Sequence, residues 1–135
     1  MGEKLFRKPY LYFWISIPIL IIYGFLNGDG TLSVNYYDTY FIINNSHLIA
    51  VLALAFSIIG FWYWLMHKLH RRLILWMTII HVIITVDGII LAFLLEHFFE
   101  SSQINSIMAI LIMLIFAVQI LLPLNLLLNF IKKTE

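Results

Sequence analysis

Residues 36–47 read Tyr-Tyr-Asp-Thr-Tyr-Phe-Ile-Ile-Asn-Asn-Ser-His, and within this stretch a polar, aromatic loop gives way to a long apolar segment that carries a histidine. The apolar segment extends from Phe41 to Met66. It exceeds the ~20 residues that a helix needs to cross the ~30 Å of hydrocarbon in a bilayer. We therefore expect a membrane helix over 41–66 that carries His47 at shallow to middle depth on its outer side.

Three other apolar segments occupy residues 10–26, 73–95 and 104–131. With 63% hydrophobic residues, 11% charged residues and a mean hydropathy of +0.99, the chain has the composition of an integral membrane protein. Inside a bilayer these segments must be helices, because they lack the strict alternation of a membrane β-barrel. The prediction is an all-α bundle of four transmembrane helices, with residues 1–135 forming a single domain. Pro18 and the lack of a small-residue cleavage site argue against a cleaved signal.

The charged residues predict how the bundle is oriented. All eight basic residues fall before the first segment, between the second and third, or after the fourth: Lys4, Arg7, Lys8, Lys68, Arg71, Arg72, Lys132 and Lys133. The opposite loops carry only acidic charges: Asp29, Asp38, Glu96 and Glu100. Since basic loops stay on the cytoplasmic side, both termini are expected in the cytoplasm.

Polar side chains on the second segment are candidate site residues. At ~100° of rotation per residue, Asn44 and His47 share one helix face, and Asn45 points away from it by about 160°. Such side chains also join helices by hydrogen bonds in many membrane proteins, and that alternative stays open.

The third segment has a face suited to helix packing and an ionisable residue on a different face. Small and polar residues step by three and four along one stripe, which lets helices approach closely: Thr78, His81, Thr85, Gly88 and Ala92. Asp87 lies off this stripe by more than about 100°. An ionisable group in mid-membrane indicates function by default, with a protonated side chain at a helix contact as the alternative. We expect the stripe to meet the chain's own helices and Asp87 to meet another subunit, while Gln119 on the fourth segment packs against a neighbouring helix.

Several of these motifs resemble the catalytic subunit (subunit I) of the heme-copper oxidases, the family of cytochrome c oxidase. The run Asp38-Thr39-Tyr40-Phe41 followed by His47 is similar to the start of the family's tenth helix, and His81, Gly88 and His97 have the spacing of its eleventh. The ending Leu-Leu-Asn-Phe-Ile-Lys is similar to the close of the twelfth. The chain thus resembles a stand-alone version of the last four of twelve helices.

The resemblance implies which cofactors survive. His47 matches an axial ligand of the low-spin heme, so it is the expected ligand of the heme iron, with Asn44 beside it. Asn45 occupies the position of the high-spin heme ligand, and the copper-binding histidines lie on helices that this chain lacks. The arginine pair that binds the heme propionates is also missing after the third segment. The resemblance therefore implies a b-type heme, no copper and no oxygen-reducing activity.

A heme with two histidine ligands would need a second chain, because His81 lies more than about 10 Å deeper than His47 along the bundle. We expect a homo-oligomer in a lipid bilayer, the cytoplasmic membrane of a bacterium, with a trimer favoured over a dimer and no nucleic-acid partner. The expected role is electron transfer or heme handling. Two alternatives remain, a heme-free scaffold of the respiratory membrane and proton or ion transport through Asp87. The absence of cysteine excludes disulfides and iron–sulfur clusters.

Overall fold

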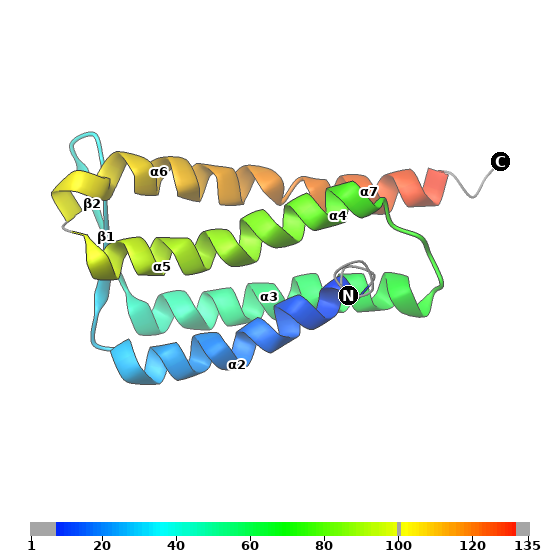
Figure 1. The fold of residues 1–135 in the computed structure, drawn as a ribbon, viewed down its shortest axis with the longest axis horizontal. Helices are drawn as coiled ribbons and strands as arrows, with labels where there is room; N and C mark the ends of the chain where they lie inside the picture. The colour runs from blue at the N-terminus through cyan, green and yellow to red at the C-terminus, as the bar shows by residue number, and fades with distance from the viewer. Residues whose placement is uncertain (1–7, 100, 132–135) are drawn as a thin grey trace.

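The computed structural model describes residues 8–99 and 101–131. Four helices in this part of the chain are long and apolar enough to cross a membrane: Pro9–Asn27, Asn45–Lys68, Leu75–Phe98 and Asn105–Ile131. Figure 1 shows them running alongside one another, with a β-hairpin at one end of the bundle. The prediction of a bundle of four helices that can cross a membrane is confirmed, with a β-hairpin that was not predicted, and the chain is an integral membrane protein by this architecture.

The first helix, α2 (Pro9–Asn27), packs against α3 (Asn45–Lys68). It begins with Pro9, whose missing N–H has no helical partner to lose in the first turn. Gly60 lets the two helices approach, because a Cβ at this position would overlap the Trp14 indole. The α2–α3 pair thus forms one side of the bundle, along the lower part of Figure 1.

A β-hairpin replaces the first turn of the expected second helix. Strands β1 (Thr31–Tyr36) and β2 (Thr39–Asn44) pair antiparallel around a two-residue turn, in which Tyr37 adopts a φ of 54°. Residues 41–44 are therefore strand, not helix. Aromatic and β-branched residues from Tyr40 to Ile43 favour strands, and pairing with β1 satisfies their backbone groups. Helix α3 begins only at Asn45, after Asn44 caps it by accepting the Ser46 N–H at 2.9 Å.

The third span consists of α4 (Leu75–Val82), a π turn η1 (Ile83–Asp87) and α5 (Gly88–Phe98). It is the most buried of the four spans. The predicted stripe is the face that it turns toward its neighbours, because Thr78, His81, Thr85 and Gly88 are all buried. Gly88 allows close contact with Ile115 on the fourth span, whose side chain lies 3.1 Å from where a Cβ would be.

The fourth span is interrupted between α6 (Ser101–Val118) and α7 (Leu121–Ile131). Pro123 has no N–H to donate to the carbonyl of Gln119 four residues earlier, so the helix cannot continue regularly through this point. The chain tightens instead, with the Gln119 N–H bonded to Phe116 and the Ile120 N–H bonded to Ala117. At this break the Gln119 side chain lies beside His81 and Thr85 of the third span.

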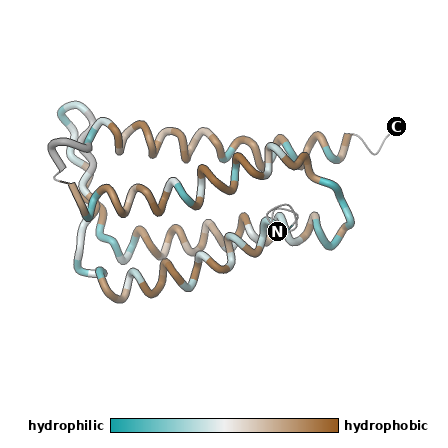
Figure 2. Tube along the Cα trace, in the orientation of Figure 1, coloured by the Kyte–Doolittle hydropathy of each residue, from teal (hydrophilic) through white to brown (hydrophobic). Residues whose placement is uncertain are grey.

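Apolar residues run along the helices and polar ones gather in the connecting segments (Figure 2). The core contains large buried side chains such as Phe13, Phe56 and Tyr63, whereas many Ile and Leu side chains on the outer faces are exposed. In a membrane protein those exposed faces meet lipid or a partner chain. A water-soluble bundle of this size would not tolerate so much exposed apolar surface.

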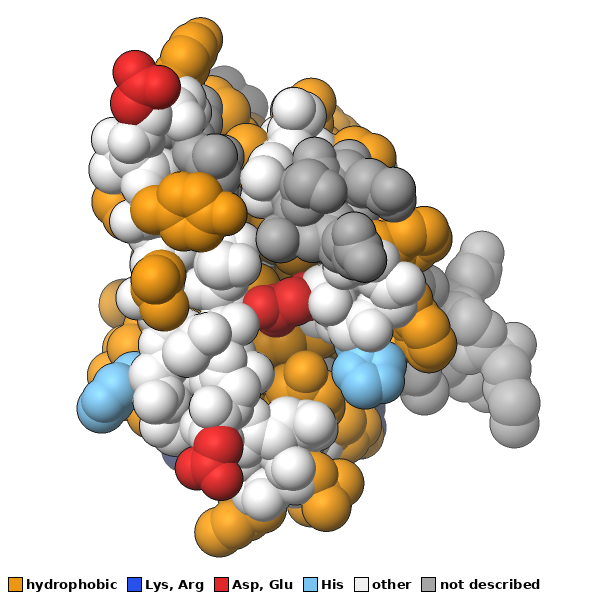
Figure 3. Space-filling model, turned by 90° about the vertical axis from the view of Figure 1, so that its left-hand side faces the viewer, with side chains coloured by type: hydrophobic (Ala, Val, Ile, Leu, Met, Phe, Trp, Pro, Cys, Tyr) orange, Lys and Arg blue, Asp and Glu red, His pale blue; other side chains and the backbone are white. Residues whose placement is uncertain are grey.

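Apart from Asp87 in the third span, the described charges lie at opposite ends of the bundle. The starts of α2 and α4 and the ends of α3 and α7 lie at one end, together with Lys8, Lys68, Arg71 and Arg72. Figure 3 looks onto the other end, where the hairpin lies, and shows acidic and histidine side chains there. The predicted positions of Lys4, Arg7, Glu100, Lys132 and Lys133 fall outside the described residues.

Candidate functional site

Three helical spans contribute to a buried polar cluster around His81, which is fully buried. Its Nδ1 lies 2.8 Å from the Tyr63 hydroxyl on α3, and its Nε2 lies 3.0 Å from Oε1 of Gln119 at the break in the fourth span. Gln119 also donates from Nε2 to Thr85 Oγ1 at 3.0 Å and to the Ile115 carbonyl at 2.9 Å. The cluster therefore connects the second, third and fourth spans.

The contacts of Gln119 determine which ring nitrogen of a neutral His81 carries the proton. A carbonyl can only accept a hydrogen bond, so the amide nitrogen of Gln119 must be the group that faces Ile115, which turns its oxygen toward His81. The Nε2 of His81 must then donate, and its Nδ1 accepts from the Tyr63 hydroxyl. With this tautomer a neutral imidazole has both nitrogens paired, and the neutral form is the one that costs least inside a bilayer.

A second amide from the fourth span holds the start of α4. Asn125 is buried; it accepts the Ile74 N–H at 2.8 Å and donates to Thr78 Oγ1 at 3.1 Å. Ile74 precedes the first turn of α4, where backbone N–H groups have no helical partner. Asn125 thus does from α7 what a capping side chain normally does from within the same helix.

Sequence reasoning did not identify Tyr63 as part of this cluster. Its neighbours Trp62 and Trp64 suggest an aromatic belt at the membrane surface, yet Tyr63 is 1% exposed and its ring stacks on Phe13. Helical spacing carries the missing signal, because Phe56, Gly60 and Tyr63 step by four and three along the buried face of α3.

The structure places His47 on the outer surface of the bundle. The residue is exposed in the first turn of α3, and its imidazole makes no hydrogen bond or ring contact with the described part of the chain. The exposed residues Val51, Leu54 and Ile58 continue the same helix face. Asn44, the other predicted residue of this site, is the N-cap of α3, and its side-chain oxygen bonds Ser46. His47 therefore faces away from the bundle, and the side-chain oxygen of Asn44 is already bonded to Ser46.

The Asn45 side chain points to the opposite side of α3 from His47 and is buried against the turn that follows α2. Its Nδ2 donates to the Asn27 carbonyl at 3.4 Å. The predicted separation of Asn45 from the His47 face agrees with this burial.

Asp87 is also exposed on the outside of the bundle. It lies 12 residues after Leu75 and 11 before Phe98, the ends of the third span, and so near its midpoint. Its carboxyl makes no hydrogen bond or ion pair with the described residues. Among these residues it is the only charged side chain in the middle of a membrane span.

The distance between His47 and His81 excludes a heme held by both within one chain. His81 contacts Tyr63, which is 16 residues beyond His47 on α3 and hence ~24 Å farther along the helix. Two axial nitrogens must sit ~4 Å apart across an iron. In addition, both nitrogens of His81 already have partners.

The described residues contain no group of three or more His, Cys, Asp or Glu side chains that could hold a metal ion. Comparison with protein-family models, with curated proteins and with solved structures found no match. The resemblance to the heme-copper oxidases therefore remains an interpretation of the sequence motifs.

Proposed function

We propose that this chain is a non-catalytic membrane subunit that assembles with further copies of itself inside the bilayer. The observation that carries the proposal is the exposed Asp87 carboxyl at the middle of the third span. A carboxyl that faces lipid at this depth is costly, and such groups usually face a partner or a water-filled cavity.

The residues around Asp87 favour a second copy as the partner. Ile83, Ile90, Leu91 and Leu94 lie three, four or seven residues from Asp87 and are each between 43% and 47% exposed, so they form one apolar stripe with the carboxyl at its centre. Around a symmetry axis the same stripe would meet itself, and protonated Asp87 side chains could bond one another. A trimer is favoured over a dimer by the threefold arrangement that the family resemblance implies.

The test is the oligomer size of Asp87→Leu in mild detergent, measured by light scattering coupled to size exclusion. We expect smaller assemblies with unchanged helical content, since the leucine removes the hydrogen bond but keeps the apolar stripe. Asp87→Asn is the matched control, because its amide can still bond across the interface, and it should keep the wild-type size. If Asp87→Leu also kept that size, Asp87 would not hold the assembly together.

The orientation we propose places both termini in the cytoplasm, in the cytoplasmic membrane of a bacterium. It is supported by the basic residues Lys8, Lys68, Arg71 and Arg72 at one end of the bundle, and by the acidic residues Asp29, Asp38 and Glu96 at the other.

A second candidate function is the binding of a low-spin, b-type heme through His47, for electron transfer or heme handling. The observation that favours it is an imidazole without partners among the described residues, on an apolar outer face. One chain supplies only one of the two axial ligands of such a site. Asn45, on the opposite side of α3, lines the same cavity as His97, so His97 does not share the His47 face. The second ligand would be His47 of another copy.

The visible spectrum of the protein purified after heme-replete expression separates the two candidates. A Soret band that persists through purification would support heme binding. A colourless protein of unchanged oligomer size would favour the assembly subunit without heme.

A further inference from the structure

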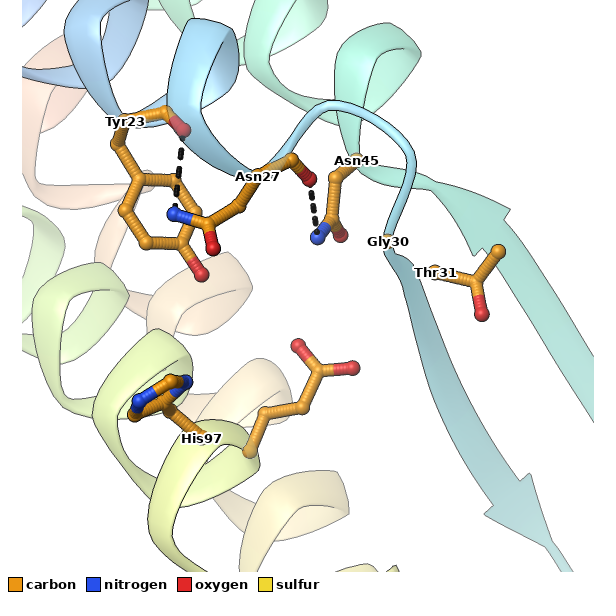
Figure 4. Close-up of a pocket in the computed structure, with 7 residues that line it drawn as sticks. Tyr23, Asn27, Gly30, Thr31, Asn45 and His97 are labelled. Carbon is orange, nitrogen blue, oxygen red and sulfur yellow. Dashed lines mark hydrogen bonds between the residues drawn. The ribbon is translucent and has the colours of Figure 1, made fainter.

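A cavity of about 310 Å³ opens at the hairpin end of the bundle, away from the His81 cluster and from the His47 face. Figure 4 shows its wall: Tyr23 and Asn27 on α2 face His97 on α5, with Asn45 and Gly30 beside them. Glu96 also lines it. Its volume is at the lower end of the range for sites that bind small molecules.

One residue of the cavity wall, Asn45, has an amide oxygen without a partner among the described residues. Asn45 is 5% exposed, and its Oδ1 is buried without a hydrogen bond in the described part of the chain. The amide orientation is determined by the Asn27 carbonyl, which can only accept and therefore faces the Asn45 nitrogen. An unpaired buried oxygen is unfavourable, and a donor that reached it from the cavity would offset that cost.

Two more lining side chains, Asn27 and Glu96, offer acceptors, next to Tyr23, Thr31 and His97, which can donate or accept. The Asn27 side chain donates from Nδ2 to the Tyr23 carbonyl, which leaves its own Oδ1 facing the cavity (Figure 4). The Glu96 carboxylate is half-buried, and one backbone hydrogen bond reaches it, from Ser33. Neither Lys nor Arg is among the described residues that line the cavity.

We propose that this cavity binds a primary ammonium group, with Glu96 as its charge partner. A primary ammonium carries three N–H donors and one positive charge. It would find acceptors on Asn27, Asn45 and Glu96, from three separate helices. The Asn45 oxygen is shielded, so the amide turns toward the ligand as it binds, and its 3.4 Å bond to Asn27 is long enough to be given up at little cost.

Two sources could supply this chemistry at the outer surface of a membrane, a free amine or the head group of an aminophospholipid. Both present the same ammonium, and a trimethylated head group has the same charge without N–H donors. The comparison of ethanolamine with choline therefore isolates the hydrogen bonds from the charge.

The first experiment uses the wild-type chain in nanodiscs of phosphatidylcholine, titrated with ethanolamine and separately with choline by calorimetry. We expect saturable binding of ethanolamine and at least about tenfold weaker binding of choline, the effect of losing hydrogen bonds to a charged group. Nanodiscs that contain phosphatidylethanolamine distinguish the sources: if the lipid is the ligand, they raise the unfolding temperature and block ethanolamine binding.

The second experiment compares two neutralised acids. Glu96→Gln keeps the shape of the side chain and removes its charge, so ethanolamine binding should weaken at least about tenfold. Asp38→Asn is the matched control, since Asp38 is exposed in the hairpin turn and does not line the cavity; its binding should equal that of the wild type.

Equal binding of ethanolamine and choline, or no saturable binding in either kind of nanodisc, would overturn the proposal and leave water as the only occupant. Equal loss of binding in Glu96→Gln and Asp38→Asn would assign the effect to the general charge of this end and would also overturn it. The wild-type comparison needs no variant, so the test stands even if Glu96→Gln folds poorly.

Discussion

The Tyr63 hydroxyl lies 2.8 Å from Nδ1 of His81, a contact between α3 and α4 in which both side chains are buried. Together with the bond from His81 to Gln119, it ties the α2–α3 side of the bundle to the last two spans. The hydrogen bonds of this cluster therefore bear on stability rather than on ligand binding.

Removing the Tyr63 hydroxyl should destabilise the bundle. Tyr63→Phe leaves the His81 Nδ1 without a donor, and we expect a loss of about 1 kcal/mol, between the ~0.6 kcal/mol average for a membrane hydrogen bond and the higher cost of an unpaired buried group. Unfolding in mixed micelles measures it. Tyr10→Phe is the control, because the Tyr10 hydroxyl has no hydrogen bond among the described residues; an equal loss in both variants would contradict the assignment.

Adding a methyl group at Gly60 should separate α2 from α3. The Cβ of Gly60→Ala would overlap the Trp14 indole, and overpacking of this kind costs about 1–3 kcal/mol. Gly24→Ala is the comparison, since its Cβ would meet the flexible end of Ile49 at 3.0 Å and should cost less. Thermal unfolding of the two variants ranks them, and the reverse order would show that the Gly60 contact is not a close one.

The orientation of the chain predicts which side of the membrane its loops reach. A reporter active only in the external compartment should be active when inserted at the hairpin turn, beside Asp38, and silent when fused to either terminus. A reporter active only in the cytoplasm should give the complementary pattern. External activity of a terminal fusion would overturn the proposed orientation.

If heme is bound, His47 should be its ligand and His81 should not. His47→Ala is expected to abolish the low-spin spectrum, because no other imidazole continues that helix face. His81→Ala should keep the spectrum and lose stability, since both of its nitrogens serve Tyr63 and Gln119. Loss of the spectrum in His81→Ala with its retention in His47→Ala would show that the ligand assigned by resemblance is the wrong one.

Periodicity and charge were enough to predict the four helices and the face by which the third packs. The stripe through Thr78, His81 and Thr85 is buried and Asp87 is exposed, as rotation along a helix requires. Such a pattern is local, so it can be found within one segment.

Features that depend on another segment were not predictable in the same way. The strand over 39–44 exists because residues 31–36 are available to pair with it, and an apolar run beside a helix gives no sign of that partner. The place of Tyr63 in the buried cluster was not predictable from its own segment, because its contact with His81 joins residues 18 positions apart in the chain. Pro123 indicates a break in the fourth helix from the sequence alone. The sequence does not indicate that Gln119, at this break, bonds His81 of another span.

The π turn at Ile83–Asp87 makes the third span sensitive to residue count. A π turn accommodates one residue more than an α turn, so winding the same residues into a regular α-helix would rotate everything beyond the turn by ~100° relative to His81. Gly88 would then leave Ile115, and Phe93 would leave Tyr23, whose ring it now meets at 4.8 Å. The π turn absorbs one extra residue and so keeps the two halves of the span in phase; a homologue lacking that residue would make the same contacts through a regular α turn, with its small and polar residues one position closer together in sequence.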